Sequence, residues 1–90
     1  MTRREMIGQA MYAACDPHVR LAVERNEHPD RYVIKRTAER ALAAMRTRGD
    51  LPESMDITAT VTITRQHGRF RLHVGYSDAL YAWIAEGDAS

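Results

Sequence analysis

The chain has 90 residues, 44% hydrophobic and 28% charged, with a formal net charge of +1. This length predicts one small globular domain over residues 1–90, and the composition excludes intrinsic disorder. No apolar run approaches the roughly 20 residues of a membrane span, so we expect a soluble, cytoplasmic protein with no membrane partner. One cysteine, Cys15, excludes an intramolecular disulfide bond.

Two helices are predicted in the first third of the chain. Apolar residues at helical spacing predict the first helix over residues 2–14. Asp16 followed by Pro17 is typical of a helix start, because aspartate caps the first turn and proline suits its first position. We therefore expect a second, short helix up to about residue 26. Its inward residues are predicted to be Val19, Ala22 and Val23.

The third helix is predicted to be the longest, over residues 30–48, with Gly49 ending it. Residues that recur every three or four positions divide it into two faces. The apolar face contains Ile34, Ala38, Ala41, Leu42 and Met45. The opposite face contains Tyr32, Arg36, Glu39, Arg40, Ala43 and Thr47. This second face is basic and includes small residues, so we expect that it can approach a ligand closely.

A change from helical to alternating spacing predicts an antiparallel β-hairpin over residues 57–76, with a turn at residues 66–68. One face of the hairpin is apolar and is expected to pack on the helices. The other face carries threonines opposite Arg69, Arg71 and His73.

A short fourth helix is predicted over residues 79–86, which completes an α+β fold of three helices, a two-stranded hairpin and a C-terminal helix. Its large apolar residues spread around the helix instead of forming one stripe. They are Leu80, Tyr81, Trp83 and Ile84. Two explanations remain open at this stage, namely burial within the same domain and a homodimer interface formed by these four residues.

Basic residues are concentrated in two segments of the chain. Residues 31–48 contain six basic residues and one acidic residue, and residues 65–76 contain three basic residues and none that is acidic. The order of helices and hairpin resembles the winged helix-turn-helix architecture, in which the third helix enters the major groove and the hairpin touches the DNA backbone. The two basic segments coincide with these two elements.

This resemblance implies a DNA-binding regulator that contacts double-stranded DNA through the third helix and the hairpin. Arginine forms bidentate hydrogen bonds with guanine and ion pairs with phosphate. The residues expected to face the groove are Tyr32, Arg36, Arg40 and Thr47. The residues expected to contact phosphates are Arg65, Arg69 and Arg71.

A second class of function remains open, a small adaptor or inhibitor of the phage or mobile-element accessory type. Such a protein would bind an acidic protein surface through the same arginines. The sequence contains no nucleophile motif, glycine-rich phosphate loop or complete zinc-ligand pattern, so we expect no enzyme activity, cofactor, metal or small-molecule substrate. Cys15 and His18 form only half of a zinc motif.

Overall fold

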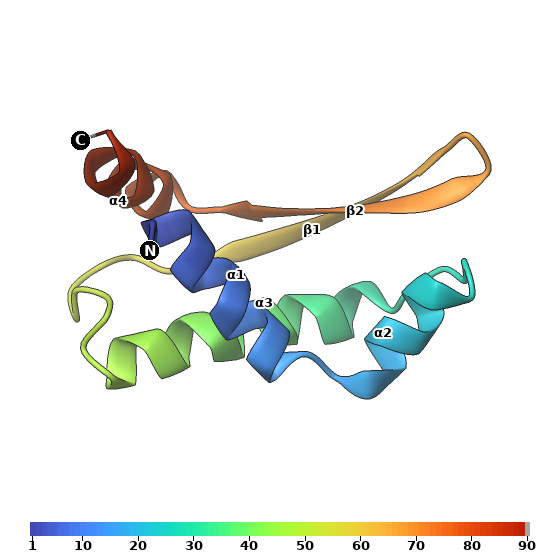
Figure 1. Ribbon diagram of the computed structural model, residues 1–90, viewed down its shortest axis with the longest axis horizontal. Coiled ribbons are helices and arrows are strands. Elements are labelled where there is room, and N and C mark those ends of the chain that lie inside the picture. Colours follow the sequence, from blue (N-terminus) through green and yellow to red (C-terminus); the bar gives the residue numbers. More distant parts are fainter. Residues whose placement is uncertain (90) are drawn as a thin grey trace.

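The computed structural model describes residues 1–89 and shows an α+β fold, with the elements in the expected order (Figure 1). The elements are α1 (Arg3–Ala14), α2 (Pro17–Glu24), α3 (Arg31–Thr47), β1 (Ala59–Gln66), β2 (Arg69–Tyr76) and α4 (Asp78–Asp88). The prediction of three helices, an antiparallel hairpin and a C-terminal helix is confirmed, and β1 begins two residues later than expected. Among residues 1–89, no helix combines the length and the apolar character that crossing a membrane requires.

Side-chain caps set the starts of the first three helices. The side chains of Thr2, Asp16 and Asp30 each accept a hydrogen bond from a backbone N–H in the first turn that follows. At the other end of α3, Gly49 has a φ of +82°, and the N–H of Asp50 donates to the carbonyl of Met45. Glycine adopts this left-handed conformation without strain, which explains why α3 ends there.

The hairpin has a two-residue turn, His67 and Gly68, whose φ values are +53° and +75°. Two positive φ values indicate a type I′ turn, whose twist matches that of the flanking strands. The register pairs Gln66 with Arg69 beside the turn and Ala59 with Tyr76 at the open end. Directly paired residues lie on the same face of the sheet, so the apolar residues of both strands share the face toward the helices, and the threonines share the opposite face with Arg71 and His73.

The core lies between α1, α3, α4 and the inner face of the hairpin. Its main cluster consists of Ile7, Ala10, Ala41, Leu42, Met45, Leu51, Leu80 and Ile84. From the inner face of β1, Ala59 and Val61 are also buried. The hairpin therefore packs on α3 through β1, while α1 crosses α3 beside it (Figure 1).

The helix α2 contributes no buried residue, although its apolar side chains were expected to face inward. Val19 and Ala22 are only half-buried, and Val23 is 53% exposed. The position of α2 explains this exposure. The short helix lies at one end of the molecule, beneath the hairpin tip, and it does not reach the main core cluster (Figure 1).

Two of the four residues predicted as a dimer interface in α4 belong to the core of their own chain. Leu80 is fully buried and Ile84 is 6% exposed. Trp83 is half-buried, and the Arg3 guanidinium lies 4.3 Å from the centroid of its ring. Tyr81 is exposed. Burial within the domain therefore accounts for Leu80 and Ile84, which have no surface to offer a second copy.

Candidate nucleic-acid interface

The exposed face of α3 gathers the four residues predicted to meet the DNA groove. Tyr32, Arg36, Arg40 and Thr47 are all exposed and lie opposite the buried residues of the same helix. The side chain of Tyr32 is 67% exposed, and the Arg36 guanidinium lies 5.8 Å from the centroid of its ring. We call this surface the α3 face, and we include the exposed flanking residues Arg31 and Lys35.

The cations of the α3 face are not neutralised by the rest of the chain. Arg31, Lys35, Arg36 and Arg40 form no ion pair within residues 1–89, where the one ion pair joins Arg48 and Asp50. The face also includes one carboxylate, Glu39, which is exposed. Exposed cations without a partner keep their hydration and their charge available for an anionic ligand.

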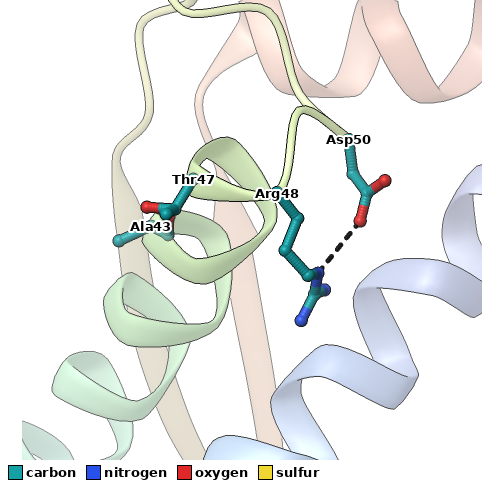
Figure 2. A network of polar contacts seen from close by, with 4 residues as sticks. All are labelled: Ala43, Thr47, Arg48 and Asp50. Carbon is teal, nitrogen blue, oxygen red and sulfur yellow. Dashed lines mark hydrogen bonds and ion pairs between the residues drawn. The ribbon is translucent and has the colours of Figure 1, made fainter.

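The C-terminal end of the α3 face is small and close to neutral. The hydroxyl of Thr47 donates to the carbonyl of Ala43 at 3.0 Å, and Arg48 Nε lies 3.2 Å from Asp50 Oδ2 (Figure 2). The Thr47 oxygen retains acceptor capacity, because a hydroxyl has two lone pairs. Arg48 lies away from this surface, on the side of α3 toward α1, where it lines a hollow with Met6 and Ala10. The positive charge of the α3 face is therefore concentrated in the N-terminal two-thirds of the helix.

One basic residue of α3 has a structural task. The guanidinium of Arg46 turns toward the loop that follows the helix, where Nη2 donates to the carbonyl of Met55, and its Nε is buried without a partner. Arg46 therefore ties residues 50–58 to the helix. The dense basic segment seen in the sequence thus contains both free surface cations and an anchor for a loop.

The three hairpin arginines predicted to contact phosphates do not share one face. Arg69 and Arg71 belong to the outer face, together with the threonines of β1, and both are exposed. Arg65 pairs with Phe70 on the inner face, and its guanidinium lies 5.5 Å from the centroid of that ring. The register explains this division. Arg69 pairs with Gln66 and shares its face, and Arg65 is the next residue along the strand from Gln66, so its side chain points to the opposite face.

The α3 face and the outer face of the hairpin point in divergent directions. The inner face of the hairpin packs on α3, so its outer face is directed away from that helix (Figure 1). Tyr32, Arg36, Arg40 and Thr47 in turn lie opposite the buried residues through which α3 contacts the hairpin and α1, and Arg31 and Lys35 lie on the flank of the helix. Six of the seven residues predicted from the sequence therefore form two separate surfaces, and the seventh, Arg65, is exposed on the inner side of the hairpin.

Sequence reasoning missed the residues that fix the hairpin tip. Asn26, in the turn between α2 and α3, donates from Nδ2 to the carbonyl of Gly68 at 2.9 Å, and its Oδ1 accepts from the N–H of Phe70 at 3.1 Å. The ring of His28 meets that of Phe70 edge-on, with centroids 5.2 Å apart. Asn26 has a φ of +53°, a conformation that asparagine tolerates better than most residues. An asparagine in this turn is therefore the one sequence feature that indicates a structural role at position 26.

Within residues 1–89 no three histidine, cysteine or acidic side chains approach one another closely enough to hold a metal ion. Burial and the neighbouring Tyr81 raise the pKa of Tyr76 above its ordinary value of 10.0. The Tyr76 hydroxyl donates to Met11 Sδ at 2.8 Å, which makes it a packing contact. Comparisons of the chain with family models, curated proteins and solved structures found no match.

Proposed function

We propose that the chain is a small, non-enzymatic DNA-binding protein whose α3 face enters the major groove of double-stranded DNA. The observation that carries this proposal is the group of four exposed cations on α3 that have no ion pair within residues 1–89. Phosphate contacts supply most of the affinity of such proteins, and they require cations that the protein itself has left unpaired.

The dimensions of α3 suit this role. Its 17 residues extend over about 25 Å, and the major groove, about 12 Å wide, admits an α-helix. Arg36 and Arg40 lie one turn apart on the same face, a rise of about 6 Å that corresponds to roughly two base-pair steps. We assign them to base edges, and Arg31 and Lys35 to the flanking phosphates. The small side chains of Ala43 and Thr47 allow the C-terminal half of the helix to approach the groove.

This assignment departs from the winged-helix expectation in one respect. A wing and a recognition helix contact the same duplex only if they face the same side, and Arg69 and Arg71 face away from α3. We therefore assign the DNA contact to α3 alone. Of the three hairpin arginines, only Arg65 lies on the side of the hairpin that faces the helices. The outer face of the hairpin is left for a separate role.

The test is fluorescence anisotropy of a labelled generic duplex titrated with the protein at about 50 mM and about 200 mM salt. On a generic duplex, which offers no preferred bases, Arg36 and Arg40 neutralise phosphates as Arg31 and Lys35 do. Four such contacts predict a slope of about −3.6 in a plot of log affinity against log salt, which is roughly a hundredfold loss over this range. The double variant Arg36→Ala, Arg40→Ala should bind more weakly at about 50 mM salt and show a shallower slope.

The matched control is Arg69→Ala, Arg71→Ala, which removes the same charge from exposed positions on the other surface. This variant should keep the affinity of the original protein within about threefold. Equal losses in both double variants would refute α3 as the site and indicate attraction by net charge alone. Absence of binding at about 50 mM salt would refute DNA binding, and an acidic protein surface would then be the remaining interpretation of the α3 face.

A further inference from the structure

The outer edge of β2 presents backbone groups that the chain does not pair. In an antiparallel ladder, alternate residues bond to the neighbouring strand, and the residues between them direct their N–H and C=O groups to the other side. The pair Gln66 and Arg69 closes the turn, and the Ser77 N–H donates to the Thr58 carbonyl, which fixes the bonded positions. The in-between residues of β2 therefore point off its free edge. They are Phe70, Leu72, Val74 and Tyr76.

One end of this edge already bonds an amide from outside the sheet. The side chain of Asn26 binds the Gly68 carbonyl and the Phe70 N–H as the backbone of an added strand would. Beyond it, the edge groups of Leu72 and Val74 have no partner within residues 1–89. Unpaired edges of this kind accept extended peptides, which bind through main-chain hydrogen bonds.

A largely apolar groove begins beside this edge, between β2, α1 and α4, and continues past Leu72 between α1, α2 and α3, with Arg4, His73 and Arg20 among its lining residues. Two hollows of about 340 and 280 Å³ form it, and Gly8 of α1 lines both. The first contains Val74 and Tyr81, and the second contains Met11 and Leu72, whereas neither contains a residue of β1. An added strand directs alternate side chains toward such hollows, so its inward residues would be apolar.

Charge decides what the outward residues of an added strand should be. On the outer face of β2, Arg69, Arg71 and His73 follow one another, and their partners in β1 are a glutamine and two threonines. No carboxylate in residues 1–89 pairs with these three side chains. Opposite charges across neighbouring strands are stabilising and like charges are destabilising. A second copy that added its own β2 antiparallel would place arginine beside arginine when Phe70 or Arg71 lies at the centre of the pairing, and it would offer no carboxylate to Arg71 in any register, because β2 contains none. A partner with acidic residues therefore fits better.

We propose that the free edge of β2 and its groove bind an extended segment of a partner protein in which apolar and acidic residues alternate. The segment adds a third strand to the hairpin, with its apolar side chains over Gly8 and its carboxylates beside Arg71 and His73. This site lies apart from the α3 face and does not depend on DNA binding.

The probe is a fluorescein-labelled eight-residue peptide of alternating valine and glutamate, compared with one of alternating valine and lysine. The intact protein should bind the glutamate peptide at least tenfold more tightly, with amide NMR shifts at Leu72 and Val74. The double variant Arg71→Glu, His73→Glu should reverse the preference, because both positions are exposed and paired with neutral residues.

The groove is tested with Gly8→Leu, matched to Gly8→Ala. A Cβ at Gly8 meets no atom within 4 Å, and both replacements favour the helix, so both variants should fold. Gly8→Leu should weaken binding of the glutamate peptide at least tenfold, and Gly8→Ala should leave it within about threefold. Arg36→Ala, Arg40→Ala should also leave it unchanged, which separates this site from the proposed DNA interface.

Three results would overturn the proposal. The first is failure of both peptides to bind the intact protein, and the second is equal binding of the two. The third is a dimer in sedimentation analysis that Gly8→Leu abolishes, which would make a second copy the occupant of the edge.

Discussion

Replacing Asn26 by glycine removes the side chain that joins the turn between α2 and α3 to the hairpin tip. Both hydrogen bonds of its amide are lost, one to the Gly68 carbonyl and one from the Phe70 N–H. Glycine adopts the φ of +53° without strain, so the change removes the two bonds without straining the turn. At about 1 kcal/mol of net stabilisation for each bond, the free energy of unfolding should fall by about 2 kcal/mol.

Two related variants of Asn26 separate the contributions. Asn26→Ala adds the cost of a left-handed residue with a Cβ, about 1 kcal/mol, and should be the least stable. Asn26→Asp keeps an acceptor for the Phe70 N–H and loses the donor to Gly68, so it should lie between glycine and the original protein. In a domain of this size, 2 kcal/mol corresponds to a fall in Tm of roughly 8–16 °C.

The assay combines urea unfolding with hydrogen exchange of the Phe70 amide. That N–H points off the edge of the sheet and is bonded to Asn26 Oδ1, so its protection should disappear in Asn26→Gly while the paired amides of the strand stay protected. An unchanged free energy of unfolding, within about 0.5 kcal/mol, together with an unchanged Phe70 exchange rate would refute this account of how the tip is held.

Further predictions concern the core and α4. Leu80→Ala removes a fully buried side chain and should lower the free energy of unfolding by about 3–5 kcal/mol, measured by urea unfolding. Because the folded chain raises the pKa of Tyr76, it binds this proton more tightly than the unfolded chain does. That contribution is complete below pH 10 and is lost as the pH rises through the folded pKa, so urea midpoints should fall above pH 10, and less so in Tyr76→Phe. Alanine in place of glycine ordinarily stabilises a helix, but a Cβ at Gly87 would lie 2.1 Å from the Arg3 side chain. Gly87→Ala should therefore displace Arg3 from Trp83, which tryptophan fluorescence detects, and should give no gain in the free energy of unfolding.

The elements whose local signals agree with their packing were predictable from the sequence. Asp30 caps α3 and Gly49 ends it, and the alternation of β1 and β2 specified which side chains share a face. The orientation of Arg36 and Arg40 followed from the same periodicity, because the apolar stripe of α3 leaves one exposed face. Local pattern is sufficient where an element buries one face and exposes the other.

The relation between elements was not predictable. Periodicity places Arg71 on a hairpin face and Arg40 on a helix face, but it contains no information on the angle between the two. Only the packing of β1 on α3 shows that these surfaces diverge. The same limit applies to α2, since Val23 follows a helical pattern yet has no core within reach. The two hydrogen bonds of the Asn26 side chain join residues more than 40 positions apart, and local sequence signals do not act over that separation.

The contact between the first and last helices brings the two ends of the described chain together. The N–H of Arg3 donates to Asp88 Oδ1 at 2.9 Å, so the two ends of the described chain meet at one end of the molecule, far from α2 (Figure 1). A short linker could join them, and new ends could be opened in the exposed loop at residues 52–54. In such a circular permutant the most distant pairing in the sequence becomes a local one, so we expect α1 and α4 to assemble early in folding, with both basic surfaces left intact.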